Sequence, residues 1–168
     1  PEQVLLMRRA GLVVGEALQL LRQQAKPGMS TSDLDAIAEE HIRGAGATPS
    51  FLGYHGFPGT LCVSVNDEVV HGIPGSRVLA AGDVVSIDCG AIVDGWHGDA
   101  ALTLVLDPAD PADVQLAEVT EEAMWRGIAA LAVGERLHAV GAAVEDHVQR
   151  ASAASGVSYG IVEEYVGH

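Results

Sequence analysis

Two aspartates, Asp88 and Asp99, stand inside apolar, strand-like sequence, where carboxylates are uncommon. The segment 84–106 reads VVSIDCGAIVDGWHGDAALTLVL and has Asp94-Gly95 at its centre. Asp-Gly favours a two-residue hairpin turn of type I′, because both central positions need positive φ. Such a turn pairs Val93 with Trp96 and so fixes the register of two antiparallel strands.

In this register both aspartates lie on one face of the hairpin as diagonal neighbours. The other face is apolar throughout, with the facing pairs Val85–Leu104 and Ile87–Leu102. A slip of one residue would move Asp99 onto the apolar face, where an unpaired carboxylate costs roughly several kcal/mol. Two converging carboxylates and their hard oxygen atoms suit a divalent cation. The alternative is that one aspartate is simply solvated and the other forms a turn.

Two histidines could add to this chemistry. His71 is followed by Gly72 and Pro74, and we expect it at a strand end with its imidazole exposed. General acid-base work or substrate contact would suit it, although a purely structural role is equally open. His168 follows Gly167 at the end of another strand-like run, and neutral imidazole is a common metal ligand beside carboxylates.

The composition indicates one acidic domain. The chain has 168 residues, 48% of them hydrophobic, and a net charge of −14. This charge disfavours binding to nucleic acid or to an anionic membrane surface. No apolar run is long enough to span a bilayer. Cys62 and Cys89 lack any paired-cysteine spacing, which indicates reduced thiols and a cytoplasmic location.

A helix–helix–strand order is repeated along the chain. Apolar periodicity and capping residues predict helices near 4–24, 31–44, 110–133 and 137–154, and a strand near 61–65. The two helix pairs match at an offset of 106 residues, with His41 corresponding to His147. The same offset predicts a strand over 161–168, so that the second unit begins but is not completed.

Three motifs resemble those of the type I methionine aminopeptidases of peptidase family M24. They read FLGYHGFPGTLCVSVNDEVVHGIP, GDVVSIDCGAIVDGWHGDAALT and YVGH. The resemblance implies an α/β (α+β) pita-bread fold with a pseudo-two-fold repeat, an antiparallel central sheet and an incomplete second half. It implies one domain over 1–168, with a first half of about 1–106 and the start of a second half at about 107–168.

The resemblance also assigns roles to single residues. It implies that Asp88, Asp99 and His168 bind metal and that His71 is catalytic and contacts substrate. Tyr54, His55 and Cys62 resemble residues near the pocket for the methionine side chain. The implied cofactors are two divalent ions per complete site, of Co, Mn, Fe or Zn. The glutamate ligands of the family would lie beyond His168, so we expect the chain as given to be weak or inactive alone.

The implied reaction is removal of N-terminal methionine from nascent proteins by a water that bridges two metals. The implied partners are methionyl peptides, at the ribosome, with no nucleic acid and no membrane, and the full-length protein is expected to be a cytoplasmic monomer. Two alternatives remain: a proline-directed peptidase of the same fold, and a non-catalytic pita-bread binding module. The HGIP and YHG contexts favour the methionine enzyme over the first, and the retained Asp-Asp-His set argues against the second.

Overall fold

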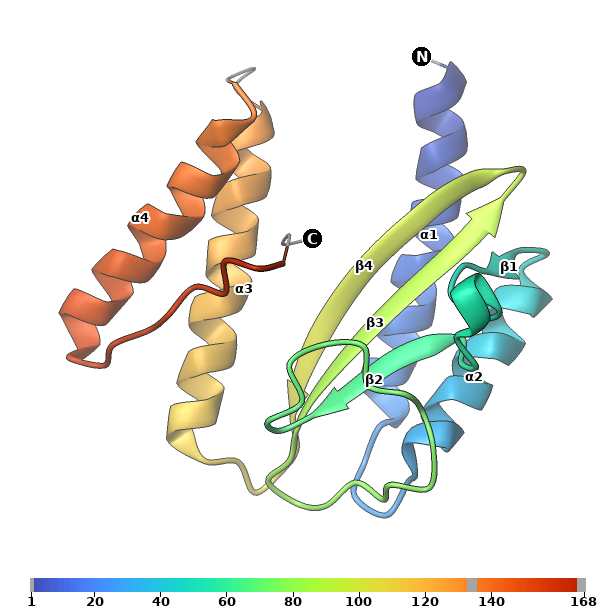
Figure 1. Cartoon of the computed structure of the whole chain (residues 1–168), viewed down its shortest axis with the longest axis horizontal. Coiled ribbons are helices and arrows are strands. Elements are labelled where there is room, and N and C mark those ends of the chain that lie inside the picture. Colours follow the sequence, from blue (N-terminus) through green and yellow to red (C-terminus); the bar gives the residue numbers. More distant parts are fainter. Residues whose placement is uncertain (1, 133–135, 166–168) are drawn as a thin grey trace. The chain divides into compact units, whose positions relative to one another are not determined.

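The computed structural model describes residues 2–132 and 136–165 (Figure 1). His168, one of the expected metal ligands, lies outside the described residues. The chain divides into two compact units, Pro1–Ala109 and Asp110–His168.

Two helices open the first unit. Helix α1 spans Glu2–Gln24, and helix α2 spans Thr31–Gly44. The sequence offers a hydroxyl at Ser30 with an acid, Asp33, three residues on, which predicts a helix N-cap. Ser30 does cap α2, and its side chain accepts a hydrogen bond from the amide of Asp33. The Asp33 carboxylate in turn accepts from the Ser30 amide, which completes a capping box. These exchanged bonds set the point at which the chain enters α2.

The helices pack on a four-stranded antiparallel sheet. Its strands are β1 (Thr48–Pro49), β2 (Leu61–Val65), β3 (Val84–Val93) and β4 (Trp96–Val105), and a short 3-10 helix, η1 (Tyr54–Gly56), lies between the first two. Strand β3 pairs with all three others. The predicted hairpin register is confirmed, because Val93 opposes Trp96. Both turn residues have positive φ, 51° at Asp94 and 81° at Gly95, as a type I′ turn requires.

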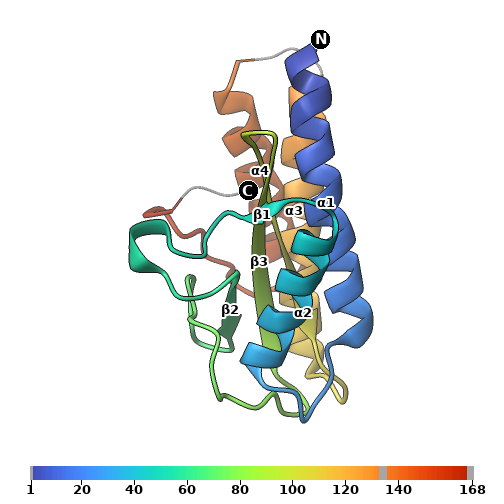
Figure 2. The ribbon, with the colours of Figure 1, turned by 90° about the vertical axis from the view of Figure 1, so that its right-hand side faces the viewer.

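Alternation along the strands separates a core face from a polar face. Val85 and Ile87 are fully buried on the core face together with Leu61, Val63 and Val65 of β2. Side chains of α1 and α2, among them Leu21 and Leu34, complete this core. Figure 2 shows both helices on one side of the sheet, with η1 on the other side. Helices α1 and α2 therefore pack on the core face and not on the polar face.

Gly98 allows α1 and β4 to approach closely. A methyl group added at Gly98 would lie 2.6 Å from the Ala10 carbonyl oxygen and 2.6 Å from the Gly11 amide nitrogen. Backbone atoms of a helix cannot give way as a flexible side chain can. Glycine at this position therefore sets the distance between α1 and the strand that carries Asp99.

The second unit is a pair of helices, α3 (Pro111–Ala132) and α4 (His138–Ser155), at the positions that the 106-residue offset predicts. Asp110 directly precedes α3, and its carboxylate accepts a hydrogen bond from the amide of Ala112 in the first turn. Gly127 is buried, and a methyl group there would lie 3.3 Å from Val140 and Val144. Four large apolar side chains of α3 are exposed in the structure, Leu116, Trp125, Ile128 and Leu131.

The strand predicted over 161–168 is not present in its described part. Residues 161–165 form no strand, and Ile161, Val162 and Tyr165 are about half exposed. A strand needs a neighbour for its backbone hydrogen bonds. Within residues 2–132 and 136–165, every strand lies between residues 48 and 105, and none of them pairs with residues 161–165. Helix formation is local, which is why the same repeat predicted α3 and α4 correctly.

No helix in the described ranges, 2–132 and 136–165, combines the length and apolarity that a membrane crossing requires.

We expect Gly98→Ala to lower the free energy of unfolding by about 1–3 kcal/mol, because the added methyl group forces α1 away from β4. Gly15→Ala is the matched control, since nothing lies within 4 Å of a methyl group at this exposed position of α1. That variant should be neutral or stabilising by up to about 1 kcal/mol. Urea denaturation followed by circular dichroism measures both. Equal stabilities of the two variants would show that the close approach carries no energetic cost.

Candidate functional site

The polar face of the sheet brings together side chains from three strands. Cys62 of β2 lies opposite Asp88 of β3, and Asp88 lies opposite Ala101 of β4. Asp99 opposes Gly90, two residues along from the Asp88–Ala101 pair. Both aspartates are therefore on this face as diagonal neighbours, as the hairpin register predicts.

Burial differs between the two aspartates, whereas their charge acts on the same thiol. Asp88 is half-buried, with its Oδ1 atom inaccessible to solvent, whereas Asp99 is exposed. Both carboxylates act on the Cys62 thiol: burial, then the negative charges of Asp88 and Asp99, raise its pKa to about 12. Burial and the same two charges raise the pKa of Cys89 to about 12 as well. The polar face therefore concentrates negative charge around the Cys62 thiol, whereas Cys89 lies on the core face.

Asp35 fixes the start of the strand that carries Cys62. Its Oδ1 atom accepts hydrogen bonds from the amides of Thr60, at 2.8 Å, and Leu61, at 2.7 Å. The carboxyl group is half-buried, and this burial raises its pKa. The sequence did not single out Asp35, because a helical carboxylate that binds a distant strand leaves no local pattern.

Two further residues border the face without having been predicted. Phe51 packs beside Gly90, since a methyl group at Gly90 would lie 2.8 Å from the phenylalanine ring. His97 lies on the same face as Asp99 by alternation, and its Nδ1 atom is 3.4 Å from the Ser50 hydroxyl. The position of His97, two residues before Asp99 in the strand, is a signal that could have indicated it.

His71 does not lie at a strand end, and this part of the prediction is wrong. It lies in the loop between β2 and β3, is exposed, and has a left-handed φ of 59°. The loop still places it beside the polar face, because the amide of Gly72 donates to Ser64 Oγ at 3.1 Å. The carbonyl of Gly72 accepts from the amide of Val63 at 2.9 Å. Backbone contacts to β2, which no periodicity records, replace the expected strand ladder.

The predicted pocket residues divide into two groups. Tyr54 and His55 lie on η1, are exposed, and form a T-shaped ring pair with centroids 4.4 Å apart. His55 has a left-handed φ of 48°, which is unusual for a residue other than glycine. Cys62 instead lies within the sheet, buried and directly opposite Asp88.

The donor set of the face suits a hard divalent cation. Asp88 and Asp99 offer carboxylate oxygens from adjacent strands, which are the ligands that such ions prefer. Within the ranges that the structure describes, no three His, Cys, Asp or Glu side chains gather so as to hold a metal ion. The two aspartates are therefore the part of a candidate metal centre that the structure describes. The third predicted ligand, His168, lies outside the described residues.

We expect both thiols to react slowly with Ellman's reagent at pH 8, because burial and a pKa of about 12 leave very little thiolate. In a Cys89→Ser background, Asp88→Asn should speed labelling of Cys62, since it removes a negative charge that raises the thiol pKa. Asp67→Asn, an exposed turn residue, is the control and should change nothing. Both thiols should react rapidly once urea unfolds the protein. Rapid labelling of the folded, unmodified protein would contradict the buried arrangement of Cys62 and Cys89.

The chain matches known proteins along almost its whole length. The family model for metallopeptidase family M24 matches residues 5–168. Methionine aminopeptidase 1 from Mycobacterium tuberculosis is 54% identical over 163 residues, which cover 96% of this chain and 61% of that protein. The chain spans about three fifths of the length of the curated relatives that it matches.

Solved structures agree with this match. Methionine aminopeptidase from Rickettsia prowazekii superposes with a TM-score of 0.82 at 32% identity, covering 89% of this chain and 60% of that one. Prolidase from Pyrococcus furiosus shares the fold, with a TM-score of 0.74 at 18% identity over 89% of this chain and 43% of that one. The sequence match, the fold and the paired aspartates lead to one assignment: the chain belongs to metallopeptidase family M24.

Proposed function

We propose that the protein from which this chain comes is a methionyl aminopeptidase, which removes N-terminal methionine from polypeptides with the help of divalent metal ions. The observation that carries the proposal is the placement of Asp88 and Asp99 on one face of the β3–β4 hairpin. The relatives from Mycobacterium tuberculosis and Rickettsia prowazekii, which bear the name methionine aminopeptidase, support the choice of substrate.

Asp88, Asp99 and His168 would hold the metal in this proposal. A complete site would contain two ions of Co, Mn, Fe or Zn and would take further ligands from outside these residues. When bound, the ions would lower the pKa of a water molecule and polarise a carbonyl group. The residues of the chain provide the binding charge: Asp88 has one oxygen removed from solvent, and Asp99 lies on the neighbouring strand.

His71 would act on the substrate. Its exposed imidazole could donate a hydrogen bond or a proton near the scissile amide, a task that suits histidine near neutral pH. We further propose that Tyr54, His55 and Cys62 lie near the pocket for the methionine side chain. Phe51, which packs beside Gly90 at the edge of the polar face, would add apolar surface there.

The surroundings of the reaction follow from the same proposal. The substrates would be nascent proteins, met at the ribosome, and the complete enzyme would be a cytoplasmic monomer. The net charge of −14 and the two free thiols are consistent with this setting and disfavour nucleic acid as a partner. The chain of 168 residues alone should have weak activity or none, because two aspartates and one histidine provide too few ligands for two ions.

A proline-directed peptidase is the second candidate, since the prolidase from Pyrococcus furiosus has the same fold. Its identity is 18%, against 54% for the methionine aminopeptidase from Mycobacterium tuberculosis, so the latter better supports a proposal about substrate. A non-catalytic module is the third. A peptidase assay separates the three candidates. A methionyl aminopeptidase hydrolyses methionyl peptides, a proline-directed peptidase hydrolyses Xaa-Pro peptides, and a non-catalytic module hydrolyses neither.

The metal proposal predicts that this chain binds Mn²⁺ weakly and that Asp88→Asn and Asp99→Asn each reduce the affinity by roughly tenfold or more. Each change replaces a charged oxygen ligand by a neutral amide. Isothermal titration calorimetry measures the affinity, and Asp67→Asn, a carboxylate in an exposed turn, is the control. Equal losses for all three variants would indicate general charge attraction and would reject a specific site.

The catalytic proposal is tested on a chimera in which this chain continues into the corresponding carboxyl-terminal part of the Mycobacterium tuberculosis relative. The chimera should hydrolyse a methionyl tripeptide with added Mn²⁺ or Co²⁺, whereas the 168 residues alone should not. His71→Ala should reduce turnover by about 10²–10⁴-fold with little change in metal affinity. His138→Ala, exposed on α4, is the control. Comparable turnover by the chimera and the short chain would refute the expectation that the short chain is weak.

A further inference from the structure

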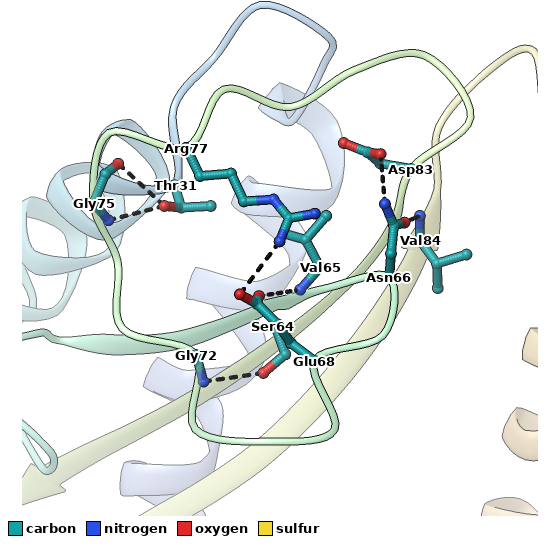
Figure 3. Close-up of polar contacts among 10 residues, drawn as sticks. All are labelled: Thr31, Ser64, Val65, Asn66, Glu68, Gly72, Gly75, Arg77, Asp83 and Val84. Carbon is teal, nitrogen blue, oxygen red and sulfur yellow. Dashed lines mark hydrogen bonds and ion pairs between the residues drawn. The ribbon is translucent and has the colours of Figure 1, made fainter.

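The loop that carries His71, residues 66–83, is tied to the sheet where it begins (Figure 3). The backbone amide of Asn66 donates to the Val84 carbonyl at 2.8 Å, and its side-chain carbonyl accepts from the Val84 amide at 2.9 Å. Its side-chain amide donates to Asp83 at 2.9 Å. The first residue after β2 is therefore held against the first residue of β3.

A second tie holds the later part of the loop to helix α2. The buried hydroxyl of Thr31 accepts from the amide of Gly75 at 2.9 Å and lies 3.1 Å from the carbonyl of the same residue. The amide of Thr31 donates to the carbonyl of Arg77 at 2.9 Å. Residues 75–77 are thus fixed by backbone contacts, independently of any side chain of the loop itself.

An ion pair joins the beginning of the loop to its later part. Glu68 forms an ion pair with Arg77, with 3.2 Å between Oε1 and Nη1. The other oxygen of Glu68, Oε2, accepts from the amide of Val65 at the end of β2, at 2.8 Å. Figure 3 shows the Arg77 side chain reaching across the loop to Glu68. The segment 69–76, which contains His71, is therefore closed at its base by this pair.

The segment needs such a closure because His71 holds an unfavourable backbone conformation. Its φ of 59° is left-handed, which costs a residue other than glycine free energy. The next residue, Gly72, is bound to β2 by the hydrogen bond from the Val63 amide and by the bond to Ser64 Oγ, and these contacts help to hold the conformation. Closing the base of a loop removes competing conformations, so the hydrogen bonds between Gly72 and β2 are formed for more of the time.

We propose that Glu68 and Arg77 are positioning residues for His71, an inference that rests on the substrate role proposed for that histidine. The Arg77 and Glu68 side chains are 41% and 44% exposed. An ion pair this exposed contributes little to global stability. Its effect should therefore fall on the loop, as a change in how firmly His71-Gly72 sits against β2.

The direct test is amide hydrogen exchange of this chain, followed by NMR, in Glu68→Gln and Arg77→Gln. Glutamine at 68 keeps an acceptor for the Val65 amide and removes only the charge. Exchange of the Val63 and Gly72 amides should become about two- to fivefold faster in both variants, while that of Ile87, in the core of β3, stays unchanged. Arg77→Lys, which keeps the charge, should stay close to the unmodified protein.

Glu39→Gln is the matched control for this experiment. Glu39 forms an ion pair with Arg43 at 2.8 Å on α2, with 37% and 53% of the two side chains exposed. Its removal should leave the Val63 and Gly72 amides unchanged. Equal acceleration of Val63, Gly72 and Ile87 would indicate global destabilisation and overturn the proposal, as would no acceleration at all.

Turnover of the chimera provides the second arm. Glu68→Gln and Arg77→Gln should lower kcat by about two- to fivefold, with KM and metal affinity little changed, and Glu39→Gln should not. Faster exchange with unchanged kcat, in an enzyme that His71→Ala inactivates, would overturn the positioning role. If His71→Ala proves fully active, the role proposed for His71 fails, and the exchange rates alone decide whether Glu68 and Arg77 hold the loop.

Discussion

The register of the β3–β4 hairpin is the constraint on which the rest of the structure depends. The Asp94-Gly95 turn sets it, and the apolar side chains that face α1 and α2 make any slip costly. Because side chains alternate with a period of two, the same register that buries Ile87 brings Asp88 and Asp99 to the opposite face. Folding and the candidate metal site are thus two results of one pairing.

Much of this could be predicted because the signals are local. Asp-Gly at a hairpin turn, alternation in the flanking strands, and the Ser30–Asp33 capping box each lie within a few residues of the feature that they determine. The helices of the second unit were likewise predicted from periodicity and from the 106-residue repeat. Local rules reached the candidate site as well, since both aspartates lie in one hairpin.

The parts that sequence reasoning missed depend on contacts between distant residues. His71 was expected at a strand end, but its place is set by Gly72 against β2 and by Thr31 of another element. Phe51 reaches the polar face because Gly90 has no side chain, and no pattern in either segment records this. The strand expected over 161–168 does not form in residues 161–165, for a related reason. A strand needs a neighbouring strand for its backbone hydrogen bonds, whereas a helix makes these bonds within itself.

Paramagnetic broadening of amide NMR signals by substoichiometric Mn²⁺ shows directly whether Asp88 and Asp99 form one cation site. The signals of Cys62, Asp88, Asp99 and Ala101, which the register places together, should broaden first. Signals at the exposed acidic positions of α1, Glu2 and Glu16, should remain sharp at the same Mn²⁺ concentration. Broadening centred on α1, or spread evenly over the acidic residues of the chain, would contradict a single site at Asp88 and Asp99.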